Sequence, residues 1–151
     1  MKTDTYMPIC LDLSQKRCLV VGGGNVALRK IGVLRRFGAL VTCLSPELVK
    51  GLENIKGKGG ISYIKGRYPG RVSLTDYKLV IAATDDPAIN GLIARRARLE
   101  RVLVNVVDGS SPGDVMMPAI LKKRGLTVGV STGGSSPSRA KKVRDKIRDA
   151  I

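Results

Sequence analysis

The sequence predicts an α/β fold in which a parallel β-sheet is covered by helices on both faces. Short and almost wholly apolar segments alternate along the chain with longer amphipathic ones, which is typical of a sheet buried on both sides. A glycine-rich turn joins the first apolar segment to the first amphipathic one. Hydrophobic residues make up 43% of the 151 residues and aromatic residues only 3%, so we expect an aliphatic core.

Five apolar segments are expected to form the strands of this sheet, because glycine, proline or polar residues bound each of them. They span residues 17–21, 40–44, 61–64, 78–83 and 102–107. A basic amphipathic helix is predicted over residues 25–37, ending at Gly38. A short helix is expected after the second strand, with Ser45 as its cap and Pro46 in its first turn. Another helix is expected from Pro87 to about Glu100.

The sheet is complete near Asp108, so residues 1–110 are expected to form a domain of their own. Residues 111–151 are too few for a second core. They are predicted to form strands at 115–120 and 126–130 and a basic helix from about Pro137. Two strands and a helix attached to a finished sheet would expose apolar surface in a monomer. The sequence therefore predicts a dimerisation arm and a symmetric homodimer.

The composition excludes several kinds of site. The chain has no His, which removes His bases and His metal ligands, and we expect no metal site. The lack of Trp and the single Phe argue against a base-stacking surface. Lys and Arg number 27 against 12 Asp and Glu, for a net charge of +15. Such a balance predicts an acidic partner or substrate.

The cysteines and the N-terminus indicate a compartment. Cys10, Cys18 and Cys43 form no CxxC pair and have apolar neighbours, so buried thiols in a reducing compartment are expected. The N-terminal residues lack the apolar core of a signal peptide. No apolar run approaches the roughly 18 residues that a membrane span needs. The prediction is a soluble, cytoplasmic protein.

The glycine turn reads Gly22-x-Gly24-x-x-Ala27 and lies between a predicted strand and a predicted helix, as in a Rossmann unit. In that pattern Gly22 permits the tight turn, Gly24 lets the backbone approach a pyrophosphate, and Ala27 lets the helix pack on the strand. Asn25 and Val26 would then offer backbone N–H groups to phosphate. The alternative is a glycine turn that binds nothing.

The acidic residue that binds the ribose in such units, about 20 positions on, is missing. Leu44 and Ser45 occupy that corner and Glu47 follows. Either Glu47 reaches the ribose, or Ser45 and backbone groups do, or Glu47 only stabilises the dipole of its own helix. No arginine stands at this corner to bind a 2′-phosphate. NAD is therefore expected rather than NADP.

Two further strand ends carry polar residues at the edge where α/β sheets bind ligands. Thr84 comes first after the fourth strand and is expected to line the cofactor cleft, whereas Asp85 and Asp86 fit a helix cap better. Asp108 ends the fifth strand. Without His, a carboxylate is the natural general base, which favours Asp108. The alternative is a turn-forming Asp ahead of Gly109.

A second loop rich in glycine and hydroxyl groups, residues 131–136, opens the last helix. Its backbone N–H groups and the nearby Arg139, Lys141 and Lys142 suit an anion. The alternative is a plain cap by Ser136. The basic run over 139–148 is equally compatible with a solvated face or a nucleic-acid patch.

Together these blocks, in their order along the chain, resemble the precorrin-2 dehydrogenases. The matching segments cover nearly the whole chain: Pro8–Leu13, Cys18–Lys30, Ala82–Asp86, Asn105–Asp108, Met117–Ile120 and Val130–Pro137. The resemblance implies NAD-dependent oxidation of precorrin-2 to sirohydrochlorin, a step toward siroheme and in some lineages heme or cobalamin. It also implies a homodimer whose arm interlocks with that of its partner.

The resemblance further implies residue roles. Asn25 and Val26 would lie on the cofactor phosphates, Pro46 and Glu47 on the adenosine side, and Asp108 would be the catalytic carboxylate. The loop expected to face the tetrapyrrole contains Ser131, Thr132, Gly133, Ser135 and Ser136. Some members also insert iron or cobalt. Members commonly continue into a further helical region, whereas this sequence ends at Ile151, so chelatase activity is left open.

Two rival functions share part of this pattern. A non-enzymatic, NAD-binding regulatory module would have the same first half but would need neither Asp108 nor the second glycine loop. A nucleic-acid-binding protein would explain the charge, but the basic residues are spread over several predicted helices instead of one. The enzyme is the favoured interpretation, the regulatory module the second and the nucleic-acid binder the third.

Overall fold

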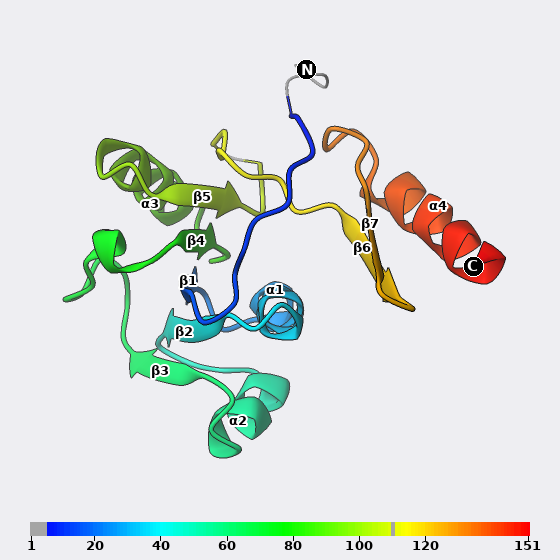
Figure 1. The fold of residues 1–151 in the computed structure, drawn as a ribbon. Coiled ribbons are helices and arrows are strands. Elements are labelled where there is room, and N and C mark those ends of the chain that lie inside the picture. The colour runs from blue at the N-terminus through cyan, green and yellow to red at the C-terminus, as the bar shows by residue number, and fades with distance from the viewer. Residues whose placement is uncertain (1–5, 110) are drawn as a thin grey trace. The chain divides into compact units, whose positions relative to one another are not determined.

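The computed structural model describes residues 6–109 and 111–151. It divides into two compact units, both of which are drawn in Figure 1. The larger unit is Leu11–Asp114, and the smaller one contains Val115–Ile151 together with residues 6–10. The predicted domains, 1–110 and 111–151, stay a prediction.

The larger unit is built on a five-stranded, wholly parallel sheet in the order β3-β2-β1-β4-β5. The strands are β1 (Arg17–Val21), β2 (Leu40–Ser45), β3 (Ser62–Lys65), β4 (Leu79–Ala82) and β5 (Leu103–Val106). The chain leaves β1 toward one edge through β2 and β3 and then crosses to β4 and the other edge. This is the Rossmann order, which reverses direction between β1 and β4. The predicted α/β fold is confirmed.

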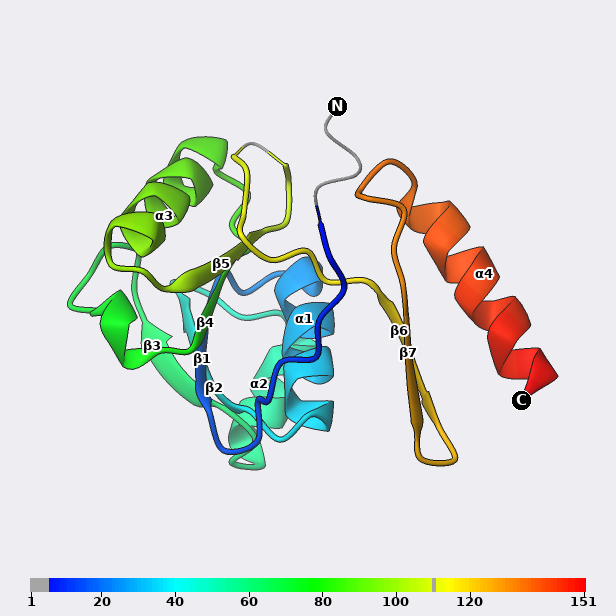
Figure 2. The same cartoon turned by 45° about the horizontal axis from the view of Figure 1, so that its top comes forward.

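Helices cover both faces of this sheet. On one face α1 (Asn25–Arg36) packs on β1 and β2, and α2 (Lys50–Gly57) lies beside it, with Gly51 against Leu28. On the other face α3 (Pro87–Leu99) packs on β4 and β5, next to the short 3-10 helix η1 (Leu74–Asp76). Figures 1 and 2 show this division of the helices between the faces. Within the described residues no helix has the length and apolar character to cross a bilayer.

The core is aliphatic, as the composition predicted. On the α1 face, Ala27, Ile31 and Leu34 are fully buried against the sheet. On the α3 face a continuous cluster joins Leu19 of β1 and Val80 of β4 to the helix. Aliphatic burial of this kind stabilises the unit by roughly 25 cal/mol for each Å² of apolar surface removed from water.

The start of α2 differs from the prediction. Ser45 does not cap this helix, which begins at Lys50 after Val49. Ser45 is instead the last residue of β2, paired with Lys65, and the Tyr63 hydroxyl donates a hydrogen bond of 2.9 Å to its carbonyl oxygen. These contacts keep the chain extended at Ser45, so the turn into α2 comes several residues later.

The cysteine prediction is correct for two of the three side chains. Cys18 and Cys43 are buried, and burial raises the pKa of each thiol to about 11. Cys10 is exposed, which corrects the expectation that all three are buried. Its segment precedes β1 and has no strand or helix of its own, so its apolar neighbours gave a misleading signal.

The smaller unit consists of an antiparallel hairpin and one helix. Strands β6 (Ala119–Lys123) and β7 (Leu126–Val130) are joined by Arg124 and Gly125, both with positive φ, and α4 (Pro137–Ala150) packs on both strands. The predicted strand over 115–120 starts late, at residue 119, because Pro118 has no N–H to donate to a ladder. The other strand and the helix lie where they were predicted.

Candidate functional site

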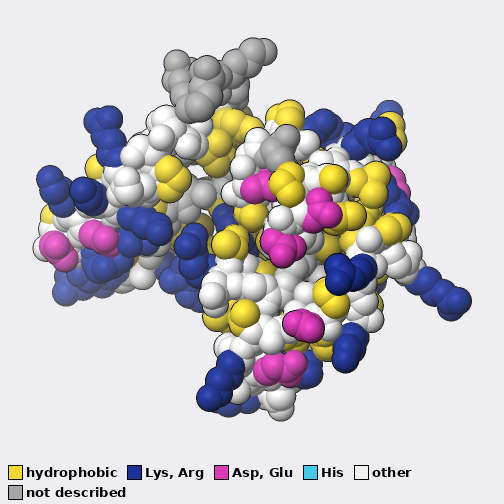
Figure 3. Space-filling model, turned by 180° about the vertical axis from the view of Figure 1, so that it is seen from behind, with side chains coloured by type: hydrophobic (Ala, Val, Ile, Leu, Met, Phe, Trp, Pro, Cys, Tyr) yellow, Lys and Arg dark blue, Asp and Glu magenta, His cyan; other side chains and the backbone are white. Residues whose placement is uncertain are grey.

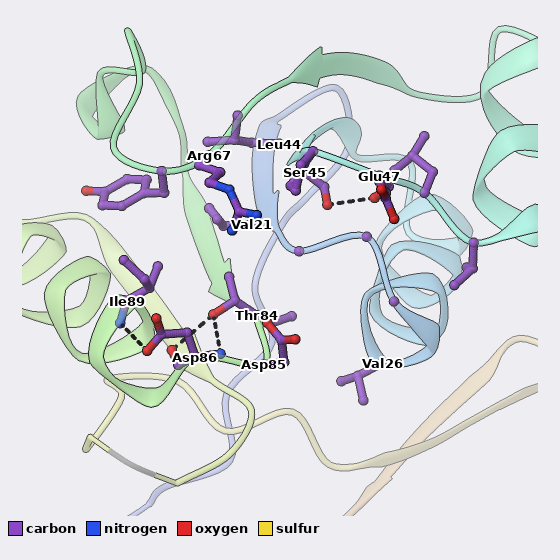
Figure 4. Close-up of a pocket in the computed structure, with 18 of the residues that line it drawn as sticks. Val21, Val26, Leu44, Ser45, Glu47, Arg67, Thr84, Asp85, Asp86 and Ile89 are labelled. Atoms are coloured by element: carbon purple, nitrogen blue, oxygen red, sulfur yellow. Dashed lines mark hydrogen bonds between the residues drawn. The ribbon is translucent and has the colours of Figure 1, made fainter.

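A cavity of about 630 Å³ opens at the carboxyl edge of the sheet in the larger unit, where the strand order reverses (Figure 4). Ligands of open α/β sheets bind at this place. All the residues predicted to bind the cofactor line it: Gly22, Gly24, Asn25, Val26, Pro46, Glu47 and Thr84. These residues come from three different strand ends, so the fold alone brings them together.

Gly22 is required by the backbone of a neighbouring strand. Its φ is +125°, and a Cβ at this position would lie 2.2 Å from the carbonyl oxygen of Ala83. Its N–H donates to the Leu44 carbonyl at 2.9 Å. No L side chain fits between the ends of the neighbouring strands β1 and β4, which supports the tight-turn role predicted for Gly22.

Gly23 is required by the loop that follows β2, a role that the motif did not indicate. A Cβ here would lie 2.0 Å from the carbonyl oxygen of Glu47. The backbone N–H of Val49 donates to the Gly23 carbonyl at 2.9 Å. The glycine turn and the loop after β2 therefore form one wall of the cavity.

Gly24 has a different environment from its two neighbours. A Cβ built on it meets no atom within 4 Å, and its φ of −86° suits any residue. It is the N-cap of α1 and supplies no side-chain cap to that helix. Asn25 and Val26, whose backbone N–H groups begin α1 at the positive end of the helix dipole, line the cavity and have no side-chain cap. A phosphate group fits this position by charge, by donors and by room.

Glu47 lies in the cavity wall and not in a helix. The first acidic residue of α2 is Glu53, so the alternative in which Glu47 stabilises its own helix dipole is wrong. The Ser45 hydroxyl donates to the Glu47 carbonyl oxygen at 2.7 Å, which uses the Ser45 proton and fixes the Glu47 backbone (Figure 4). The Glu47 residue is exposed, so its carboxylate is accessible to a ligand.

Arg67 is a cavity residue that the sequence argument missed. It follows β3, and the N–H of the preceding Gly66 donates to the Ser45 carbonyl at 3.1 Å. Figure 4 shows its guanidinium reaching toward Val21 at the end of β1. Among the described residues it has no hydrogen bond or ion pair. The expectation that no arginine stands at this corner is wrong, because it considered only the residues that follow the second strand.

The end of β4 forms a compact polar turn. The Asp86 carboxylate accepts hydrogen bonds from the N–H groups of Ala88 at 2.8 Å and Ile89 at 3.4 Å, so Asp86 caps α3 as predicted. The Thr84 hydroxyl lies 2.7 Å from the side-chain oxygen of Asn90 and accepts a bond from the Asp86 N–H at 3.2 Å. Thr84 lines the cavity, and hydrogen bonds to Asn90 and Asp86 fix its hydroxyl group.

Asp108 is an exposed residue beyond the end of β5, next to Val107, which lines the cavity. Its carboxylate accepts a hydrogen bond of 2.8 Å from the side-chain amide of Asn90. Asn90 therefore joins Thr84 at the end of β4 to Asp108 at the end of β5. The only sequence signal for Asn90 was a polar residue in register with the buried Ile93, Ala94 and Ala97 of the same helix.

The second glycine loop lies in the smaller unit and is held by its own hydroxyl groups. The Ser131 hydroxyl accepts from the Gly133 N–H at 3.1 Å, and the Thr132 hydroxyl accepts from the Ser136 N–H at 3.0 Å. The Ser135 hydroxyl donates to the Thr132 carbonyl at 2.6 Å. Ser136 caps α4 through the Arg139 N–H at 3.3 Å, as the cap interpretation predicted. The structure thus gathers the predicted substrate residues into one turn.

Comparison with known proteins bears on this site. Residues 9–119 match the family described as "Putative NAD(P)-binding". The siroheme synthases of Chromobacterium violaceum and Methylococcus capsulatus are each 38% identical to this chain over 146 residues. These matches cover 97% of this chain but only 31% of each relative, so the chain spans about a third of their length.

Among solved structures, "SirC, precorrin-2 dehydrogenase" superposes with a TM-score of 0.77 at 26% sequence identity. The match covers 97% of this chain and 71% of that one. The resemblance found in the motifs is therefore confirmed, since the similar proteins include siroheme synthases and a precorrin-2 dehydrogenase. The family match spans the glycine turn, the cavity and the whole parallel sheet. This chain belongs to that family of NAD(P)-binding proteins.

Proposed function

We propose that this chain is an NAD-dependent dehydrogenase that oxidises precorrin-2 to sirohydrochlorin in the cytoplasm, as a step of siroheme biosynthesis. The observation that carries the proposal is one edge of the sheet that holds both an uncapped helix N-terminus and an oriented carboxylate. The likeness to siroheme synthases and to a precorrin-2 dehydrogenase supports the choice of substrate.

Different cavity residues contact different parts of the cofactor in this proposal. Gly24, Asn25 and Val26 hold the pyrophosphate through backbone N–H groups, without a competing side-chain cap. Pro46 and Glu47 contact the adenosine, and Thr84 contacts the nicotinamide half. When bound, the oxidised nicotinamide supplies a hydride acceptor at its C4 carbon.

Asp108 is the general base of this reaction. The substrate loses two hydrogens, one as a hydride to the cofactor and one as a proton, which the Asp108 carboxylate takes. The products are sirohydrochlorin, NADH and that proton, and the extra conjugation of the macrocycle favours the forward direction. The protein contributes orientation of the two partners and a base at a fixed position.

We assign NAD rather than NADP to the cavity because of Glu47. Its carboxylate, in the wall after β2, suits the two hydroxyl groups of an unmodified ribose and repels a 2′-phosphate. Arg67 is the opposing charge in the same cavity. Measured affinities for both cofactors test this assignment.

The second loop and the basic surface serve the substrate, whose rim carries acetate and propionate carboxylates. Figure 3 shows Lys and Arg over much of the visible surface, and they are dense over the smaller unit. Helix α4 carries Arg139, Lys141, Lys142, Arg144, Lys146 and Arg148. Ser131, Thr132, Gly133, Ser135 and Ser136 face the tetrapyrrole in this proposal. Residues 111–151 form the arm of a homodimer, which a sedimentation mass of one chain at micromolar concentration would contradict.

The residue-specific test is Asp108→Ala, assayed anaerobically with precorrin-2 and NAD. Turnover is expected to be lost while the NAD dissociation constant stays within about twofold, because Asp108 moves a proton and does not hold the cofactor. Unchanged turnover would refute the assignment. If the unmodified chain binds NAD but oxidises nothing, the regulatory-module interpretation gains instead. Cobalt or ferrous iron added after oxidation reports on chelatase activity.

A further inference from the structure

Asn90 is a buried polar residue that neither the sequence motifs nor the proposed mechanism uses. It lies in the first turns of α3 and is fully buried. A buried amide destabilises the fold unless its polar atoms find partners. Its neighbours on the same helix face, Ile93 and Ala94, are apolar and also fully buried. A polar side chain at this buried position therefore indicates that its hydrogen bonds have a specific role.

All the hydrogen-bonding capacity of the Asn90 side chain is used. Its oxygen accepts from the Thr84 N–H at 3.1 Å and from the Thr84 hydroxyl at 2.7 Å. Its nitrogen donates to the Thr84 carbonyl at 3.0 Å and to the Asp108 carboxylate at 2.8 Å. A primary amide offers two donor hydrogens and two acceptor lone pairs. The amide is thus saturated, three bonds going to Thr84 and one to Asp108.

The backbone of Thr84 decides which way the amide faces. A backbone N–H only donates and a backbone carbonyl only accepts, so the Asn90 oxygen must face the first and its nitrogen the second. Exchanging the two atoms would place donor against donor and acceptor against acceptor. The Asn90 group that faces the Asp108 carboxylate is consequently an N–H donor, and the Thr84 backbone alone sets this orientation.

A donor in this position has two effects on Asp108. It favours the ionised carboxylate, which is the form that accepts a proton. It also ties an exposed side chain at the end of β5 to the end of β4, where Thr84 lines the cavity. Displacement of a reacting group by about 1 Å can lower a rate by roughly 100-fold.

We propose that Asn90 is a positioning residue for the dehydrogenase reaction, which holds Asp108 at a fixed distance from Thr84 and in its proton-accepting form. The inference rests on the proposed function of Asp108. Asn90 itself touches neither substrate nor cofactor in this account, so its removal acts on proton transfer through Asp108 and on the cofactor contact through Thr84, which it also holds.

The test is a double-mutant cycle of Asn90→Ala and Asp108→Ala in the full chain. Asn90→Ala is expected to lower kcat at saturating NAD by roughly 100-fold, with the KM for precorrin-2 within about twofold. The NAD dissociation constant is expected to rise by much less than kcat falls, because Thr84 also loses a partner. In Asn90→Ala, activity is expected to begin rising with pH at a higher pH than in the unmodified chain, because the Asp108 carboxylate has lost the N–H donor of Asn90. The double variant is expected to match the residual single-turnover rate of Asp108→Ala alone, because both changes act on one step.

Three further variants accompany this cycle. Asn90→Asp keeps the shape and the acceptor for Thr84 but replaces the donor with a charge, and it is expected to lower kcat at least as much. Asn54→Asp adds the same charge at an exposed position on α2 and is expected to leave kcat unchanged. Asn90→Ser replaces Asn90→Ala in the cycle if the latter does not fold.

The outcomes separate the two proposals. If Asp108→Ala is inactive while both Asn90 variants keep the kcat and pH profile of the unmodified chain, the inference is overturned and the proposed base stands. An equal loss of NAD binding and of kcat in the Asn90 variants also overturns it, because that pattern marks a merely structural residue. If Asp108→Ala keeps its activity, the proposed base fails and the inference fails with it.

Discussion

The two glycine-rich loops of this chain look alike in sequence but differ in how they treat the helix that follows. Gly22–Gly24 precedes α1 and provides no side-chain cap, and the first residues of that helix line a cavity. The loop before α4 is different: the Ser131 and Thr132 hydroxyls accept N–H groups of the loop itself, and the Ser136 hydroxyl accepts the Arg139 N–H in the first turn of α4. The first turn of α1 therefore keeps more free N–H groups for an anion than the first turn of α4, where Ser136 already accepts the Arg139 N–H.

The glycines of the two loops also differ in what requires them. At Gly22 the requirement is a neighbouring backbone, whereas a Cβ at Gly134 would meet the end of a flexible side chain, Met116, at 3.2 Å. At Gly24 no part of the chain requires a glycine. The fold does not require a glycine at position 24, so the open space beside it is available to a ligand.

The largest effect is expected for Gly22→Ala. The added Cβ would lie 2.2 Å from a carbonyl oxygen in a backbone conformation that L residues rarely adopt. The free energy of unfolding should fall by about 3 kcal/mol or more. Gly134→Ala, at a φ of +86°, should cost about 1–2 kcal/mol. Urea unfolding of both variants measures the difference. Equal losses in the free energy of unfolding would show that the contact between residue 22 and the Ala83 carbonyl is less close than 2.2 Å.

Gly24→Ser gives the first loop the cap that the second loop has. Serine is a preferred N-cap and meets no atom here, so stability should hold or rise by a few tenths of a kcal/mol. Its side chain would occupy the open space and bond the N–H groups that phosphate needs. Calorimetry should show NAD binding weakened at least about tenfold, or about 1.4 kcal/mol. Undiminished affinity would mean that the pyrophosphate binds elsewhere.

Ser136→Ala removes the cap of α4 and is expected to lower the free energy of unfolding by about 1 kcal/mol. NAD affinity should not change, because this loop does not hold the cofactor in the present account. Thermal unfolding and calorimetry on the same sample measure both quantities. A loss of NAD affinity as large as that of Gly24→Ser would remove the distinction between the loops.

The smallest effects are expected in the adenosine half of the cavity. Glu47→Gln should improve NADP binding by about threefold and weaken NAD binding slightly, because one repelling charge is removed from an exposed site. Arg67→Ala should weaken both cofactors, and NADP at least as much as NAD. The two dissociation constants for each variant, measured at low and high salt, test the assignment. Unaltered selectivity in Glu47→Gln would place the 2′-position away from this wall.

Much of the larger unit was predictable because most residues of its central strands, β1 and β4, are apolar and buried. The β1 prediction matches to the residue, and the predicted cofactor residues share one cavity because strand ends of a parallel sheet meet at one edge. Arg67 escaped because its place depends on β3 pairing with β2, a fact about strand order. Asn90 escaped because a single sequence does not show which polar helix residue faces inward. The start of α2 depends on the Tyr63 hydroxyl bond, a contact between residues far apart in sequence.

The most direct test of the whole account is a single-turnover reaction of the unmodified chain with precorrin-2 and NAD under anaerobic conditions. Absorbance should show sirohydrochlorin and NADH appearing together, at the same rate and in equal amounts, since each oxidation releases one hydride. Sirohydrochlorin without NADH, or bound NAD without any oxidation, would contradict the central claim that this sheet edge carries a nicotinamide-dependent dehydrogenase.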